Sequence, residues 1–145
     1  MQISDVLRIK GSDVVRVVET DSVASAVQKL SERRIGAVIV EDRWMKLVGI
    51  FSERDVINAL ARRGPQILDD RVHELMTTPV VTCRSSDRIE AAMAMMTMKR
   101  IRHLPVINDG ELKGIISIGD LVKHRLDEKE LEASVLLQIS RMRAE

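Results

Sequence analysis

Two seven-residue segments of this chain carry a serine and, three positions later, an aspartate. The first is GIFSERD at positions 49 to 55, and the second is GIISIGD at positions 114 to 120. A helix that begins at such a serine presents backbone N–H groups and a partial positive charge, which suit a phosphate. The aspartate beside it can accept hydrogen bonds from the two hydroxyls of a ribose. The pattern is therefore compatible with a nucleotide site.

The same spacing also has a purely structural explanation. The serine can cap a helix while the aspartate bonds back to the serine backbone, and this capping box needs no ligand. Two glycines count against that explanation alone. The glycine that opens each segment marks a place where the backbone turns or comes close to something, and Gly119 stands where a structural first turn would favour a better helix former. Both features favour a cleft.

The two segments belong to an internal repeat with an offset of about 66 residues. VVRVVETDSVASAV (14–27) aligns with VVTCRSSDRIEAAM (80–93), and Arg34-Ile35 aligns with Arg100-Ile101. After one residue is dropped in the loop near Trp44, the glycine, serine and aspartate of the two segments coincide. The chain therefore consists of two similar repeats.

Each repeat is predicted to fold as strand, helix, strand, strand, helix, which gives an α/β (α+β) protein. β-branched runs predict the strands, and apolar residues at helical spacing predict the helices. The last two strands of each repeat are expected to pair as hairpins. Strands are predicted at 14–18, 37–40, 47–51, 80–83, 104–107 and 112–116, and helices from 23 to the pair Arg33-Arg34, at 55–63, at 89–99 and from 120 to about 126.

The composition disfavours several classes of protein. The 145 residues are 45% hydrophobic and 31% charged, as in ordinary soluble domains. The net charge of +1, with one Trp, one Phe and no Tyr, disfavours nucleic acid as a partner. The lone Cys83 cannot form an internal disulfide, and neither a signal-peptide core nor an apolar run of about 20 residues is present. We therefore expect a cytoplasmic protein that does not contact the membrane.

The duplicated pattern resembles the CBS domain, named for cystathionine β-synthase, in its tandem form. The resemblance covers roughly residues 3 to 126, because an R-I-x-x-x-P-V or I-G-A-V-I-V strand and a G-h-h-S-x-x-D turn follow a strand and a helix in both halves. It implies two repeats that pack through their sheets about a pseudo-twofold axis. It also implies two clefts that bind adenosine ligands such as AMP, ADP, ATP, NAD(H) or S-adenosylmethionine, with no metal required.

The resemblance further implies a sensor module without catalytic activity, usually a homodimer, which here must signal to an unknown protein partner in trans. The expected parts are a first repeat at 1–63, a connecting segment at 64–78, a second repeat at 79–126 and a C-terminal amphipathic helix at 127–145. The last helix is expected to pack on the module or on a second subunit.

The cleft of the second repeat matches the family pattern fully. Asp120 corresponds to the ribose-binding aspartate, and Ser117 and Gly119 correspond to the turn that faces the phosphate. Arg102 and His103 correspond to the polar or basic pair that reaches the phosphate. The cleft is expected to borrow an adenine-side segment from the other repeat, namely Lys10, Gly11 and the backbone of Val15.

The cleft of the first repeat matches the pattern only in part. Asp55 and Ser52 correspond to Asp120 and Ser117, but Gly36-Ala37 stands where Arg102-His103 stands in the second half. Arg54 is the only obvious local cation. The borrowed segment is expected to comprise Met76, Thr77, Thr78 and Val81. We therefore expect AMP to fill the Asp120 cleft first.

Three functions remain open at the level of the sequence. The first is a regulatory module that binds AMP, with NAD(H) or S-adenosylmethionine as alternative ligands. The second is an interaction or scaffold protein whose clefts have lost their ligand. The third, an enzyme, lacks a recognisable nucleophile with a base, a metal set or a pair of carboxylates at useful spacing.

Overall fold

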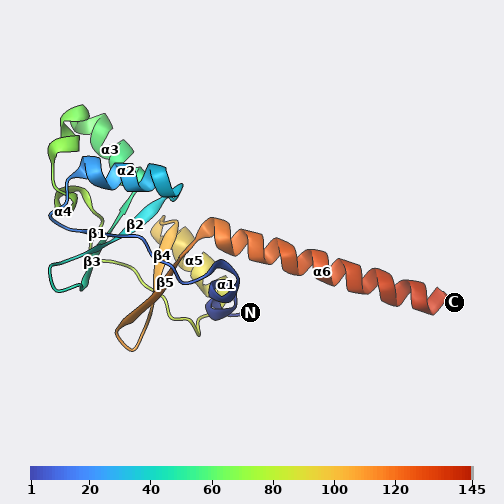
Figure 1. The fold of residues 1–145 in the computed structure, drawn as a ribbon. Helices are drawn as coiled ribbons and strands as arrows, with labels where there is room; N and C mark the ends of the chain where they lie inside the picture. The colour runs from blue at the N-terminus through green and yellow to red at the C-terminus, as the bar shows by residue number, and fades with distance from the viewer. Residues whose placement is uncertain (145) are drawn as a thin grey trace. The chain divides into compact units, whose positions relative to one another are not determined.

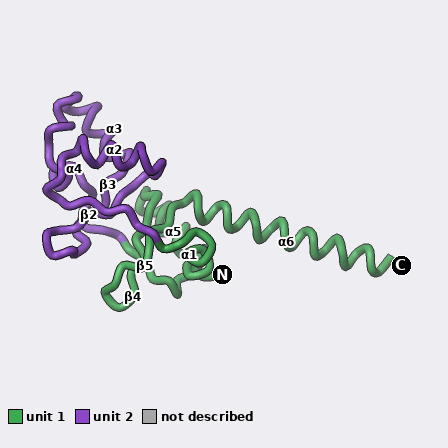
Figure 2. The backbone as a smooth tube through the Cα atoms, in the orientation of Figure 1, with its two compact units in different colours: residues 1–12, 82–145 green, residues 13–81 purple. Residues whose placement is uncertain are grey.

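A computed structural model describes residues 1–144, which form two compact units (Figures 1 and 2). Unit 2 comprises residues 13–81, and unit 1 comprises residues 1–12 together with the chain from residue 82 onward. The units thus divide the chain at different places from the sequence repeats. The segment before the first strand of the first repeat belongs to the same unit as the second repeat.

Unit 2 contains a three-stranded sheet. The sheet consists of β1 (Arg16–Val18), β2 (Ala37–Glu41) and β3 (Leu47–Ser52), with β1 parallel and β3 antiparallel to β2. The parallel pair needs a long crossover, which α2 (Val23–Arg33) supplies. Completing the unit are α3 (Glu53–Arg63), the 3-10 helix η1 (Pro65–Asp69) and α4 (Val72–Leu75). Its core contains Val17, Val23, Ala26, Leu30, Val38, Val40, Phe51 and Val72.

Unit 1 contains a two-stranded sheet and its helices. The strands β4 (His103–Asn108) and β5 (Glu111–Ser117) form an antiparallel hairpin. The helices α1 (Ile3–Lys10), α5 (Ile89–Lys99) and α6 (Ile118–Ala144) complete the unit, and α6 packs with α1, α5 and β5. Ile3, Val6, Ile89, Leu104, Ile116 and Leu121 are among its buried residues.

The mixed α/β class and both hairpins are confirmed, but the predicted strand at 80–83 is wrong. Only Cys83 pairs there, in a single parallel bridge to Val106. In unit 2 the equivalent ladder is extended because the N–H of Ile39 donates to the carbonyl of Val15 at 3.1 Å. Pro105, the counterpart of Ile39, has no N–H and cannot donate that bond. The second sheet therefore has two strands instead of three.

The predicted boundary between two C-terminal helices is also wrong. The sequence predicted that one helix ends near Leu126 and another starts at Asp127, whereas α6 runs without a break from Ile118 to Ala144. No glycine or proline lies between Asp120 and Ala144, and residues 127–133 are mostly strong helix formers. Nothing in this stretch ends the helix.

Candidate functional site

The two Ser-x-x-Asp motifs lie at equivalent junctions, between β3 and α3 and between β5 and α6. The backbone N–H of Ser52 donates to Oδ2 of Asp55 at 2.9 Å, and the N–H of Asp55 donates to Oγ of Ser52 at 3.4 Å. The corresponding distances for Ser117 and Asp120 are 2.8 and 3.1 Å. The capping-box interpretation is therefore correct for both motifs. In each case the box uses only one oxygen of the aspartate, so it leaves room for a second role.

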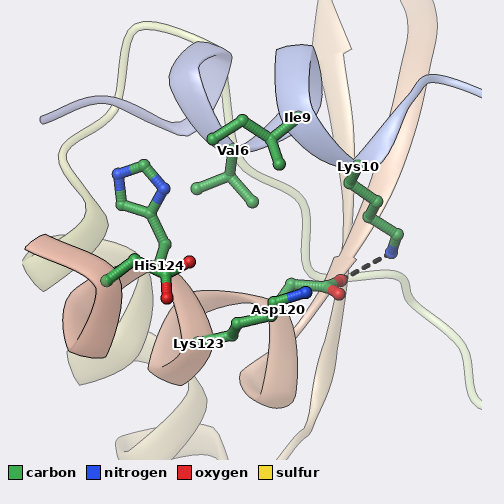
Figure 3. A pocket seen from close by; sticks show the side chains of 7 residues that line it. Val6, Ile9, Lys10, Asp120, Lys123 and His124 are labelled. Carbon is green, nitrogen blue, oxygen red and sulfur yellow. Dashed lines mark hydrogen bonds and ion pairs between the residues drawn. The ribbon is translucent and has the colours of Figure 1, made fainter.

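A residue from the preceding segment meets each aspartate, and the two contacts differ. Thr77 donates its hydroxyl to Oδ1 of Asp55 at 2.9 Å. The ammonium of Lys10 donates to Oδ2 of Asp120 at 2.6 Å and to the carbonyl of Ile115 at 2.7 Å (Figure 3). The two donors to Asp120 thus share one oxygen, whereas Asp55 is bonded through both of its oxygens.

Asp120 remains ionised at neutral pH. Its partial burial raises the pKa of the carboxyl, but the hydrogen bonds from Lys10 and Ser117 and the charge of Lys10 outweigh this and hold the pKa below its usual value. The carboxylate is therefore available as an acceptor wherever the protein is folded near neutral pH.

The glycine that opens each segment allows the preceding segment to come close, as the sequence predicted. A Cβ on Gly49 would lie 2.5 Å from Sδ of Met76 and 3.2 Å from the carbonyl of Thr77. Thr77 and Ile50 exchange backbone hydrogen bonds of 2.8 and 3.1 Å at this point. A Cβ on Gly114 would lie 2.8 Å from Cδ2 of Leu7, at the end of α1 that carries Lys10.

Gly11 and Gly119, in contrast, have space for a Cβ. Gly11 ends α1 with a φ of +95°, a conformation that side chains disfavour, and a Cβ there would meet nothing within 4 Å. Gly119 is exposed, and its Cβ would only touch Oγ of Ser117 at 3.6 Å, an ordinary contact. The fold therefore does not require a glycine at position 119. The lack of a side chain there leaves the surface beside Ser117 open.

Arg102 and His103 lie beside the Ser117 turn. His103 is paired with Ser117 across the hairpin, and the carbonyl of Arg102 accepts from the N–H of Ile118 at 2.8 Å. The side chain of Arg102 is exposed, and that of His103 is partly buried. These two residues, the serine turn and Asp120 are thus brought together within unit 1.

The equivalent position in unit 2 is occupied by Gly36 and Ala37. Ala37 pairs with Ser52 in the sheet, and the carbonyl of Gly36 accepts from the N–H of Glu53 at 3.0 Å. The backbone is therefore the same at both sites, while the basic side chains are present only beside Asp120. Arg54, just before Asp55, is exposed on α3.

The remaining sequence candidates are placed as follows. Val15 belongs to unit 2 and Asp120 to unit 1, so their expected pairing stays a prediction. Val81 is partly buried at the end of unit 2, and Thr78 is exposed and precedes the cis peptide bond to Pro79.

A cleft of about 170 Å³ adjoins Asp120 between α1 and α6 (Figure 3). The Lys10–Asp120 pair lies at one end of it in the figure, and the imidazole of His124 lies at the other, next to Val6. His124 is only 8% exposed, and its Nε2 lies 3.8 Å from a carboxylate oxygen of Glu128. The lining comprises Val6, Ile9, Lys10, Asp120, Lys123, His124 and Asp127.

Sequence reasoning identified only Lys10 and Asp120 of this lining. The other polar members follow Asp120 at three, four and seven positions, which is the spacing of one helix face. That spacing was the available signal. It could not indicate that α1 covers the same face.

Among residues 1–144, no group of three or more His, Cys, Asp or Glu side chains is arranged to hold a metal ion. Within the same residues, no helix has both the length and the apolar character needed to cross a bilayer.

The family model of the CBS domain matches this chain twice, over residues 3–62 and 72–127. The chain belongs to the CBS-domain family. It is 32% identical over 146 residues to the CBS domain-containing protein CBSX3, mitochondrial, of Arabidopsis thaliana, covering 92% of this chain and 71% of that protein. It covers smaller shares, 32% and 63%, of two other curated relatives.

Solved structures of CBS proteins are also similar to this chain. A CBS-domain containing protein from Agrobacterium tumefaciens is 43% identical, with a TM-score of 0.84 over 86% of this chain and 92% of that chain. A CBS domain protein from Pyrobaculum aerophilum, complexed with AMP, is 29% identical, with a TM-score of 0.77 over 92% of this chain and 99% of that chain.

The two CBS matches explain how the compact units are composed. The first match includes α1, which lies in unit 1, and the second includes α4, which lies in unit 2. Each CBS repeat thus contributes its N-terminal segment to the unit built by the other. This exchange is how Lys10 reaches Asp120 and how Thr77 reaches Asp55.

Proposed function

We propose that this CBS pair is a regulatory module that binds an adenine nucleotide, AMP in preference to others, at Asp120, and has no catalytic activity of its own. The observation that carries the proposal is the arrangement around Asp120. An ionised carboxylate, a serine turn at the start of a long helix and an exposed arginine lie together in one unit.

The ribose is assigned to Asp120. Ser117 and Lys10 share Oδ2, so Oδ1 is the oxygen that we assign to a ribose hydroxyl. The ammonium of Lys10 has three N–H donors, of which Asp120 and Ile115 take two, so one remains for the same hydroxyl group. A vicinal diol is therefore met by an acceptor and a donor at once.

The phosphate is assigned to Arg102 and the first turn of α6. A guanidinium binds a phosphate through two parallel hydrogen bonds, and a helix N-terminus favours an anion. Ser117, Gly119 and His103 complete this side of the proposed site. The solved AMP complex of the related Pyrobaculum aerophilum protein supports the choice of AMP.

The Asp55 site is assigned a weaker role. Its Oδ1 already accepts from Thr77, and Gly36 offers no cation to a phosphate. A ligand there must replace the threonine hydroxyl and rely on Arg54, Ser52 and the segment of Thr78 and Val81. We therefore expect AMP to occupy the Asp120 site first and the Asp55 site only at higher concentration.

The first experiment is a thermal-shift series with AMP, ADP, ATP, NADH and S-adenosylmethionine. A ligand at about one hundred times its Kd should stabilise the folded chain by about 2.7 kcal/mol, with AMP effective at the lowest concentration. The absence of a shift with every adenosine ligand would refute the proposal and favour a scaffold protein with vacant clefts.

The second experiment compares Asp120→Asn with Asp55→Asn. Asp120→Asn should weaken AMP binding roughly ten- to a hundredfold. The charge-assisted hydrogen bonds to the carboxylate become neutral ones, and the amide NH2 is a donor that faces another donor. Asp55→Asn is the matched control, since it alters an equivalent capping box. Equal losses in the two variants would show that the sites are not ranked as proposed.

We further propose that the module forms a homodimer, acts in the cytoplasm and passes its signal to a separate protein. Ligand binding can change the affinity of the module for that protein only by the difference between the ligand's binding free energies for the two states of the module. Pull-down from cytoplasmic extract with and without AMP tests this part, with the Asp120→Asn variant as the control for ligand dependence.

A further inference from the structure

The second half of α6 lacks a partner within the described chain. Its first turns are packed, with Leu121 and His124 buried, but every residue from Lys129 to Ala144 is exposed. Figures 1 and 2 show this half leaving the rest of unit 1. The stretch 127–144 is about 27 Å long at 1.5 Å per residue. Because most of the stability of a helix in a protein comes from packing of its apolar face, a second surface would stabilise this stretch.

One face of this exposed half is apolar. Leu131, Val135, Ile139 and Met142 follow one another at steps of four, four and three residues, and we call them the tail stripe. They are between 43% and 74% exposed. The stripe continues the face of the buried Leu121 and His124, which precede Leu131 by ten and seven residues. The side of α6 that packs in unit 1 thus extends beyond the unit as a hydrophobic surface.

Charge is distributed unevenly along the same half. Residues 127–132, DEKELE, carry four carboxylates and one lysine, a net charge of −3. Residues 133–144 carry two arginines, Arg141 and Arg143, and no carboxylate. The exposed half of α6 is therefore acidic at one end of the tail stripe and basic at the other.

We propose that a second copy of this chain covers the tail stripe, with the two α6 helices antiparallel about a twofold axis at Val135. Val135 then faces its own copy, and Leu131 faces Ile139 of the second copy, since each lies four residues from the axis. Arg143 of one copy comes level with Asp127 of the other, and Arg141 comes level with Lys129, which lies between the carboxylates of Glu128 and Glu130. A parallel pair would place acid against acid and arginine against arginine.

A twofold pair of this kind is closed, because each copy uses the same surface and none is left for a third. The inference rests on the homodimer in the proposed function and names the surface that forms it. It does not depend on nucleotide binding. An aggregate that grows with concentration would contradict it.

The first test compares Val135→Glu with Leu137→Glu by sedimentation at micromolar concentration. Val135 lies at the centre of the tail stripe, whereas Leu137 is a leucine of similar exposure, 44% against 58%, on the other side of the helix. Two residues correspond to about 200° around an α-helix. Wild type and Leu137→Glu should sediment with twice the mass of Val135→Glu. An unchanged mass in Val135→Glu overturns the proposal.

The second test determines the orientation with a short bis-maleimide. A Leu131→Cys chain should cross-link to an Ile139→Cys chain and not to another Leu131→Cys chain, whereas a parallel pair would give the reverse. The native Cys83 is buried and serves as the internal blank in wild type. A dimer without the 131–139 cross-link overturns this surface and leaves the homodimer standing. A monomeric wild type overturns both, and neither outcome decides whether the chain binds AMP.

Discussion

Replacing Arg102 with glycine should weaken the binding of AMP and leave the binding of adenosine unchanged. The side chain of Arg102 is exposed, and the backbone carbonyl that accepts from Ile118 at 2.8 Å is retained in the variant. The equivalent position in unit 2 is already a glycine, Gly36, whose carbonyl makes the same bond to Glu53 at 3.0 Å. The fold therefore accepts glycine at this place, and the change removes the arginine side chain while the backbone hydrogen bond is kept.

The size of the loss follows from the number and kind of hydrogen bonds. A hydrogen bond to a charged group contributes about 1.5 to 3 kcal/mol, and a guanidinium makes two to one phosphate. Because Arg102 is exposed and salt screens the pair, we take the lower part of that range for the pair as a whole. At about 1.4 kcal/mol per factor of ten, AMP affinity should fall roughly ten- to thirtyfold at low salt.

Isothermal titration calorimetry with AMP and with adenosine measures the effect directly. Arg54→Gly is the matched control, since it removes an exposed arginine beside the other aspartate and should leave the tight AMP phase intact. Raising the salt should narrow the gap between wild type and Arg102→Gly. If adenosine and AMP lose affinity equally, or if AMP loses none, then Arg102 does not hold the phosphate and the ranking of the two sites has no basis.

Three further predictions concern stability and reactivity. Gly49→Ala should lower the free energy of unfolding by about 1 to 3 kcal/mol in urea, because the new Cβ would overlap Met76 and press on a backbone carbonyl. Burial raises the pKa of the Cys83 thiol to about 12, so Cys83 should react with a thiol reagent at pH 8 only as fast as the chain unfolds. The lowered pKa of Asp120 stabilises the fold above the pKa of the unfolded state, and this contribution is lost as the pH falls through the folded value. Lys10→Met should raise the pKa of Asp120 and move that loss to higher pH, which carboxyl NMR can follow.

Much of the fold could be predicted because its determinants are local. The serine caps place the starts of α3 and α6 within two residues, and β-branched runs bounded by turns give both hairpins. The equivalence of Gly36-Ala37 with Arg102-His103 could also be predicted, because both pairs precede the loop near Trp44 where the alignment of the repeats drops one residue. The hydrogen bonds at the two helix starts reproduce that alignment.

The errors arose where one missing group or a distant segment decides the outcome. Pro105 lacks the single N–H that would extend a parallel ladder, and a run of apolar residues does not reveal this. The short helices α1 and α4 were missed because their few residues make a weak periodic pattern. The contact between Thr77 and Asp55 joins residues 22 positions apart, and no local spacing indicates it. It was expected only because the family resemblance assigned Thr77 to the segment that the Asp55 cleft borrows.

The two copies of one motif now differ in the mobility of the group that meets the aspartate. Thr77 is fixed by its backbone pairing with Ile50, so its hydroxyl cannot leave Asp55 without a change in the main chain or in its own rotamer. Lys10 reaches Asp120 through a flexible four-carbon stem and can turn away while its backbone stays in place. A ligand that takes over Asp120 therefore exchanges one set of hydrogen bonds for another, and it does so at the end of α1. Asp120 lies on α6, the helix that carries the tail stripe, and α1 packs against α6. In the second repeat, ligand occupancy therefore has a direct route to the surface that we assign to dimerisation.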